Sequence, residues 1–324
     1  MTGMSRNAGW SRAFAPASVG NIGVGFDLLG HSIDGPRDEV SARRIDEPAV
    51  RILRIDGNVP GIEQLPLDAE ANTAGRALIS LRGSLGLAHG FELTIHKGIA
   101  LGSGLGGSAA SCVAALVAAN ALLDQPLPRE ALYPFALDGE SASSGSRHGD
   151  NVAPMLLGGV VMALENRMIR LPTPDWLWCT VVHPDQVLHT RRAREVLQAP
   201  YALHEAVMQS QHLAQFLTGL QTNDRELIGN GLHDVLVEPR RASLIPGFAA
   251  VKTAALDSGA LGASISGAGP SVFAWCDSRD GAERAGDAMK QAFAEAGFQA
   301  RRYVSPVAGP RAECIPEHTA EEAE

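Results

Sequence analysis

The sequence feature that most restricts the fold is a glycine-rich segment, GIALGSGLGGSAAS, at residues 98–111. Alternating apolar residues in segment 91–95 predict a strand before it, and the alanine-rich segment 108–123 predicts a buried helix after it. A tight turn between a strand and a helix gathers backbone N–H groups at the positive end of the helix dipole. We therefore predict a phosphate cradle made of backbone amides, with a simple packing turn as the alternative.

Two familiar nucleotide-binding motifs fit this loop only in part. Gly102, Gly104 and Gly107 match the G-x-G-x-x-G pattern, but a dinucleotide fold also needs an acidic residue at the end of another strand, about twenty residues on. Asp124 stands near that distance, yet its surroundings read as a helix end followed by prolines. A Walker A loop also fails, because Ser108 occupies the lysine position. A nicotinamide dehydrogenase is therefore disfavoured.

The glycines themselves carry a prediction about the loop. Residues with positive φ are strained unless they are glycine. We expect a valine at Gly104 or Gly106 to add this strain and to fill the space that a phosphate needs, whereas the Ser103 side chain should matter little.

Composition narrows the class of protein. The 324 residues provide about two domains of roughly 150 residues, and a net charge of -9 opposes a nucleic-acid partner. The most apolar segment, 109–123, is too short for a membrane span, so we expect no membrane partner. The four cysteines are widely spaced, which disfavours a zinc site or a disulfide framework. Free thiols and an N-terminal segment without an apolar core predict a cytoplasmic protein.

The order of predicted elements indicates an α+β protein with two domains, because strands and helices do not alternate strictly. We place the boundary in the loop 171–175, which gives an N-terminal domain of residues 1–172 and a C-terminal domain of residues 173–324. The acidic tail 317–324 is expected to fray. Strands are predicted at 156–164 and 176–182, a strand, turn and strand at 263–275, and helices at 191–198, 201–220, 224–236, 247–258 and 279–296.

Two further glycine-rich segments flank the loop in sequence. The segment ASISGAGPSVFAW, at 263–275, is by itself most simply a hairpin turn. The segment APASVGNIGVGFDLLG, at 15–30, places Asn21 and Asp27 among glycines and apolar residues. A buried carboxylate is costly unless it is paired. Asp27 therefore either caps a helix or faces a cationic group of a ligand.

In this order the three segments resemble the motifs of the GHMP small-molecule kinases, over nearly the whole chain. They are similar to that family's A-P-A-S…N…G-F-D start, its P-x-x-x-G-L-G-S-S-A-A phosphate loop and its S-G-x-G-P-x-x-F loop. The resemblance implies a two-domain α+β fold that binds ATP and a small substrate between its domains. The phosphate loop departs from the pattern at two positions, with Ala100 for the usual proline and Gly107 for the first serine.

Other segments narrow the substrate that the resemblance implies. SGSRHGDNVAP, at 144–154, resembles the branch of the family that phosphorylates the free amino acid L-homoserine. TRRAR, at 190–194, and EPRRASLIPGF, at 238–248, resemble the arginine segments of that branch. The first glycine-rich segment lacks the basic residue and the Glu-His typical of mevalonate and galactose kinases. The alternatives are a kinase of another small alcohol and a nucleotide-binding protein without turnover; a homodimer is one of the open oligomeric states.

The resemblance also implies site residues. Arg194 and Arg241 fall on carboxylate-binding positions, and Asn21, Asp27 and His148 fall on other substrate positions. The residues implied to bind ATP are Ile99, Ala100, Leu101, Gly102, Ser103, Gly104, Leu105, Gly106, Gly107, Ser108 and Ala109.

The implied chemistry is phosphoryl transfer, which needs mainly positioning and charge neutralisation. Glu140, helped by Ser108, would hold Mg²⁺, an ion that prefers hard oxygen ligands. Asp27 would face the substrate ammonium, and Asp150 with Asn151 would orient its hydroxyl as the catalytic pair. The proton of that hydroxyl would pass either to Asp150 or to a phosphate oxygen.

Each implied role has a simpler alternative. Glu140 would then be a helix-surface acid, and His148 and Asp150 would only order a loop. Two of the three arginines in the run 191–194 are expected to be solvated. All of these residues occur in one chain in the family's order, and this favours the functional interpretation.

Overall fold

The computed structural model describes residues 9–144, 147–198 and 200–316. Within them, a seven-stranded sheet runs in the order β11-β1-β2-β4-β3, and β5 and β6 extend it beside β2. Its neighbours are antiparallel except β3 and β4, which are parallel. The strands are β1 Ser11–Gly20, β2 Leu29–Ile45, β3 Val50–Gly57, β4 Gly90–Lys97, β5 Val160–Ala163, β6 Met168–Arg170 and β11 Glu313–Cys314.

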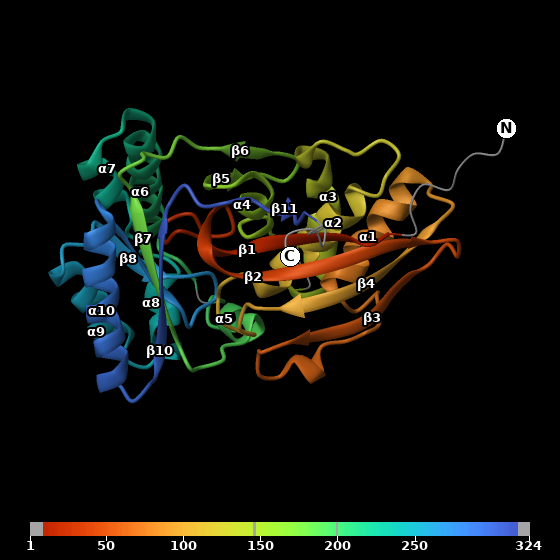
Figure 1. The fold of residues 1–324 in the computed structure, drawn as a ribbon. Helices are drawn as coiled ribbons and strands as arrows, with labels where there is room; N and C mark the ends of the chain where they lie inside the picture. The colour runs from red at the N-terminus through yellow and green to blue at the C-terminus, as the bar shows by residue number, and fades with distance from the viewer. Residues whose placement is uncertain (1–8, 145–146, 199, 317–324) are drawn as a thin grey trace, which may run out of the picture.

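Helices cover one face of this sheet (Figure 1). They are α1 Thr73–Leu85, α2 Gly107–Asn120, α3 Tyr133–Ser144 and α4 Val152–Leu157, with the short 3-10 helices η1 Ile62–Gln64 and η2 Arg129–Leu132. The alanine-rich helix α2 packs on β1 and β2 and is flanked by α1 and α3. All its residues from Ala109 to Asn120 are buried, as expected for a helix that is apolar on every side.

A second sheet, with four strands in the described residues, has the antiparallel order β10-β7-β9-β8. Its amphipathic helix α10 packs across β10, β7 and β9. The strands are β7 Trp178–Pro184, β8 Gly262–Ile265, β9 Val272–Cys276 and β10 Ala300–Pro306. The helices are α5 Thr190–Glu195, α6 Leu203–Thr222, α7 Arg225–Gly231, α8 Glu238–Arg241, α9 Phe248–Asp257 and α10 Arg279–Glu295, with the 3-10 helix η3 Ala242–Leu244.

The two halves share buried contacts. The Trp275 Nε1 on β9 donates to the His31 Nε2 on β2 at 3.2 Å, and both side chains are buried. Phe216 on α6, in the same half as Trp275, packs beside the Trp275 ring with centroids 5.5 Å apart. The last strand, β11, returns to pair with β1, and α5 lies between the halves (Figure 1). The halves therefore have fixed relative positions, which matters for a site built from both.

The predicted α+β class and most predicted elements are confirmed, including the strand, glycine loop and helix around 98–111. The predicted strand at 156–164 is wrong in its first part, because Leu156 and Leu157 end α4 and only Val160–Ala163 is extended. The predicted helix at 224–236 stops at Gly231. The division at residue 172 stays a prediction.

The sequence predicts a frayed C-terminal tail and no membrane partner. The tail 317–324 lies outside the described residues. In the described part of the chain, no helix combines the length and the apolarity needed to cross a membrane.

Candidate active site

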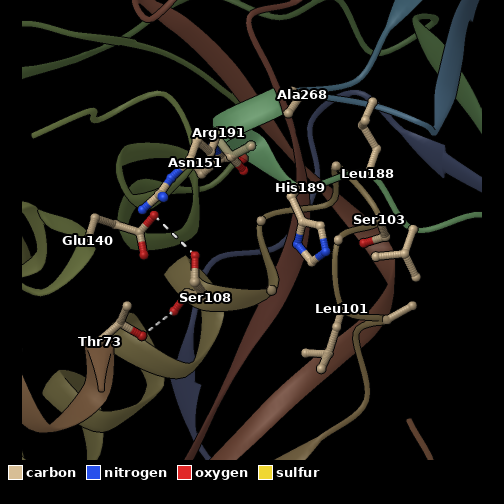
Figure 2. Close-up of a pocket in the computed structure, with 18 of the residues that line it drawn as sticks. Thr73, Leu101, Ser103, Ser108, Glu140, Asn151, Leu188, His189, Arg191 and Ala268 are labelled. Carbon is tan, nitrogen blue, oxygen red and sulfur yellow. Dashed lines mark hydrogen bonds between the residues drawn. The ribbon is translucent and has the colours of Figure 1, made fainter. Parts of the chain in front are cut away.

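A cavity of about 890 Å³ is lined by the loop before α2, by α5 and by the loop after β8. This volume lies within the usual range for small-molecule sites. Figure 2 shows Glu140 and Ser108 on one side of it and Leu188 and His189 on the other. The predicted residues that line it are Asn21, Asp27, Ala100, Leu101, Gly102, Ser103, Gly104, Gly106, Gly107, Ser108, Glu140, His148, Asp150, Asn151, Arg194 and Arg241. Ile99, Leu105 and Ala109 are instead buried in the core beside the loop.

The loop before α2 turns at three glycines in the left-handed region. Gly102, Gly104 and Gly106 have φ values of 60°, 75° and 71°. Residues other than glycine are strained there, which explains the composition of the loop. No acceptor among the described residues binds the backbone N–H of Gly104, Gly106 or Gly107. The loop therefore offers these amides, next to the N-terminus of α2, to an anion.

The carbonyl groups of the loop, by contrast, are engaged by surrounding elements. Two hydroxyl donors come from the glycine-rich segment 263–275, the third along the chain, so its role goes beyond a hairpin turn. The bonds are Leu188 N to Gly102 O (3.0 Å), Ser271 Oγ to Ser103 O (2.6 Å), Ser266 Oγ to Gly104 O (2.8 Å) and Ser18 N to Leu105 O (3.1 Å). These carbonyl oxygens are therefore paired within the protein, whereas the loop amides named above are not.

Larger side chains at the loop glycines would collide with the surrounding protein. A Cβ at Gly104 would lie 2.4 Å from the carbonyl oxygen of Ser266, and one at Gly106 would lie 2.7 Å from the Ser18 Oγ. A larger side chain would therefore meet other protein atoms around the loop, and the loss of space for phosphate stays a prediction. A Cβ at Gly107 would lie 3.3 Å from the Ile99 Cγ2, a tight contact that needs a small shift of Ile99 but is less severe than the contacts at Gly104 and Gly106.

Glu140 on α3 faces the cavity and is not a helix-surface acid. Its Oε2 accepts a hydrogen bond of 3.3 Å from the Ser108 Oγ, and the Ser108 carbonyl accepts one of 3.0 Å from the Thr73 Oγ1 (Figure 2). Burial raises the pKa of Glu140 to about 7, the Ser108 bond opposes this rise, and Asp150 adds to it. A carboxylate and a hydroxyl at a helix N-terminus are hard oxygen donors, and this set fits Mg²⁺ shared with phosphates.

Asp27 lies in the turn after β1, where no helix follows, so the helix-cap alternative is wrong. Its carboxylate binds the Arg194 guanidinium at two points, 2.8 Å for Oδ1–Nη2 and 3.2 Å for Oδ2–Nη1. The His148 Nδ1 lies 3.3 Å from the Asp27 Oδ2, and the Asn21 Oδ1 accepts from the Asp27 N–H at 3.0 Å. Burial lowers the pKa of His148. The structure thus joins four predicted substrate residues in one cluster, although positions 145 and 146 of their motif lie outside the described residues.

Arg241 is only 2 % exposed and is bonded to the backbone next to this cluster. Its Nε donates to the Ala193 carbonyl at 3.0 Å, and its Nη1 donates to the Gly267 carbonyl at 2.9 Å. The Asn21 Nδ2 donates to that same Gly267 oxygen at 2.8 Å. Burial, together with the nearby Arg194 charge, lowers the pKa of Arg241 to about 10. This arginine therefore fixes the third glycine-rich segment as well as lining the cavity.

The arginine run on α5 divides as expected. Arg191 and Arg192 are exposed and also line the cavity, and Arg192 pairs with Glu195 at 3.1 Å. Arg194 alone of the three is partly buried, against Asp27.

Asp150 lines the cavity and is 4 % exposed. Burial, followed by the charge of Asp27, raises its pKa to about 7. A Cβ at Gly30 would lie 1.7 Å from the Asp150 carbonyl oxygen, and one at Gly20 would lie 2.4 Å from its Oδ2. Asn151 is fixed by a hydrogen bond of 2.8 Å from the Ser18 Oγ to its Oδ1. Asn151 is therefore held by β1, and Asp150 packs closely against Gly20 on β1 and Gly30 on β2.

One end of the cavity was not predicted, apart from Leu101. It is lined by apolar side chains from several elements, with Asn72 at the start of α1: Ile55, Leu65, Pro66, Ile95 and Leu101. The Asn72 Nδ2 donates to the Pro66 carbonyl at 3.0 Å, while its Oδ1 caps α1. Single residues from separate elements form no sequence motif, so no local signal marks this end.

Comparison with known proteins identifies the fold and its relatives. Residues 72–159 match the GHMP kinases N terminal domain, and residues 216–295 match the GHMP kinases C terminal domain. The chain is 57% identical over 305 residues to a homoserine kinase of Xanthomonas campestris pv. campestris, covering 94% of each chain. It is 56% identical to a homoserine kinase of Xylella fastidiosa with the same coverage.

A solved structure agrees with these relatives. The crystal structure of homoserine kinase from Cytophaga hutchinsonii superposes with a TM-score of 0.90 at 42% identity, covering 97% of this chain and all of that one. The phosphate loop, the Asp27–Arg194 cluster and the Ser108–Glu140 pair all lie in the part of the chain that these matches cover. The chain therefore belongs to the GHMP kinase family, among its homoserine kinases.

Proposed function

We propose that this protein transfers the γ-phosphoryl group of ATP to the side-chain hydroxyl of L-homoserine, giving O-phospho-L-homoserine for threonine biosynthesis. The observation that carries the proposal is the paired charge of Asp27 and Arg194 beside the glycine loop. A zwitterionic amino acid presents an ammonium and a carboxylate close together. Asp27 would receive the ammonium, and Arg194 with Arg241 would bind the carboxylate, for which a planar guanidinium is well suited.

The nucleotide would lie along the rest of the cavity. The free amides of Gly104, Gly106 and Gly107 would bind its phosphates at the N-terminus of α2. The apolar end around Leu65 and Pro66 would take the adenine ring. Ser108 and Glu140 would hold Mg²⁺, which, when bound, neutralises charge on the phosphate oxygens.

Asp150 and Asn151 would orient the homoserine hydroxyl for in-line attack. A pKa of about 7 makes Asp150 suitable as a proton acceptor near neutral pH. A phosphate oxygen is the alternative acceptor, and the Asp150 side chain then serves to position the hydroxyl.

We also place this enzyme in the cytoplasm. All four cysteines are free thiols, and three of them are buried, which suits a reducing compartment.

The test is an ADP-release assay with homoserine, threonine, mevalonate, galactose and shikimate as acceptors. We expect turnover with homoserine at a kcat/KM well above that of each other alcohol. Preference for another alcohol would identify a kinase with a different substrate. Nucleotide binding without ADP release from any acceptor would identify a binding protein and refute the proposal.

A further inference from the structure

A buried ionic cluster lies beside the phosphate loop, formed by Lys97 at the end of β4, Asp38 on β2 and Ser111 on α2, and Lys97 and Ser111 also line the cavity. These residues are 3 %, 0 % and 5 % exposed. The Lys97 Nζ contacts the Asp38 Oδ2 and donates to the Ser111 Oγ at 2.9 Å. It also donates to the Gly107 carbonyl at 2.7 Å.

The same cluster holds the first residues of the loop. The Asp38 Oδ1 accepts from the backbone N–H groups of Gly98 at 3.0 Å and Ile99 at 3.1 Å. The Asp38 Oδ2 accepts from the Ser111 Oγ at 2.7 Å. One carboxylate thus joins the start of the loop to the first turns of α2, where the loop ends.

The lysine has the charge of a phosphate ligand but not the free donors. An ammonium has three N–H groups, and Lys97 directs its bonds to Asp38, Ser111 and the Gly107 carbonyl. A buried ion pair also adds little to stability, since apolar replacements of similar volume are often as stable. The bonding of this cluster to both ends of one loop indicates a geometric role.

We propose that Lys97, Asp38 and Ser111 are positioning residues for the nucleotide. By fixing the separation between Gly98 and Gly107, they hold the loop amides in the arrangement that binds phosphate, while the donors of Lys97 are directed to the protein. This inference rests on the nucleotide binding proposed above. It predicts that loss of the cluster weakens ATP binding and leaves homoserine binding unchanged, because no bond joins the cluster to Asp27 or Arg194 in the described part of the chain.

The test uses the double variant Asp38→Asn, Lys97→Met, which removes both charges together. Asparagine keeps an oxygen for the N–H groups of Gly98 and Ile99, so the loss falls on the bonds to α2. The matched control is Arg43→Met, Glu92→Gln, which removes a half-buried ion pair between the same strands, β2 and β4, away from the loop.

Calorimetry would measure the Kd of a non-hydrolysable ATP analogue with Mg²⁺ and, separately, the Kd of homoserine, after thermal unfolding has shown that each variant folds. We expect the ATP-analogue Kd to rise at least tenfold in the cluster variant, with the homoserine Kd within twofold. Both constants should stay within twofold in the control. Unchanged nucleotide affinity, or equal loss of both ligands, would overturn the inference.

Ser111→Ala keeps the test decisive if the double variant does not fold. It removes the hydroxyl between Lys97 and Asp38 but retains their ion pair, so a smaller rise in the ATP-analogue Kd, about threefold, is expected. No change in a folded Ser111→Ala protein would overturn the inference equally. Wild-type protein that binds no ATP analogue would refute the proposed function instead.

Discussion

Replacing Arg194 with methionine tests how the site recognises an amino acid. The Arg194 guanidinium is about one-third exposed and binds the Asp27 carboxylate at two points. Methionine keeps an apolar stem near the Phe26 ring and removes only the charged group. Losing one charged hydrogen-bonding partner of the substrate should cost about 1.5–3 kcal/mol. This corresponds to a fall of about ten- to one-hundredfold in kcat/KM for homoserine.

The pairing with Asp27 makes the effect depend on its neighbour. In the Arg194→Met variant, Asp27 keeps His148 but loses its bidentate partner. The single variant Asp27→Asn should therefore already have lost part of the kcat/KM for homoserine that depends on Arg194. We expect the double variant to lose less than the product of the two single losses, by roughly 0.5–3 kcal/mol of coupling, as is usual for contacting residues.

The assay compares two substrates in the wild type and in Arg194→Met. 3-Aminopropan-1-ol keeps the ammonium and the hydroxyl of homoserine but lacks the carboxylate. It should be a poor substrate of the wild type and lose little further activity in the variant, with the KM for ATP unchanged. Arg279→Met, at an exposed position that pairs with Glu283 and does not line the cavity, is the control and should leave both substrates unaffected. An equal loss for both substrates in Arg194→Met would refute the carboxylate role.

Three further predictions follow from the buried carboxylates and the glycines. Glu140→Gln should raise the Mg²⁺ concentration needed for activity and lower kcat, which a Mg²⁺ titration would measure. Because the Glu140 pKa is about 7, the wild type should lose Mg²⁺ affinity as pH falls from 8 to 6, and the Glu140→Gln variant should not. The raised pKa of Asp150 means that its stabilising contribution is present at low pH and is lost as pH rises between 3.8 and about 7. Asp150→Asn should therefore gain unfolding temperature relative to the wild type at pH 8 but not at pH 4, while kcat falls; a loss of stability at pH 8 would contradict this. Gly104→Val should lower both the unfolding temperature and ATP affinity, whereas Gly107→Ala should lower each by much less, and equal effects would refute the difference in space around the loop.

The sequence determined the parts of this protein that depend on neighbours along the chain. The strand, glycine loop and helix around 98–111 follow from apolar periodicity and from the φ freedom of glycine, both local properties. The same local signals rejected a dinucleotide fold, and Asp124 does lie in an exposed turn after α2, paired with Arg44. The predicted substrate residues were also found from contiguous motifs, and the fold brings Asn21, Asp27 and Arg194 together.

Only the tertiary structure decided what holds these pieces in register. The hydroxyls of Ser266 and Ser271 bind carbonyls of the phosphate loop more than 160 residues earlier, at separations of 162 and 168 residues, and no sequence pattern encodes such a pair. The link between Lys97 and Asp38 spans 59 residues and depends on the register of β2 and β4. Hydrogen bonds and ion pairs act over a few ångströms, so their partners are set by how the chain packs and not by their order along it.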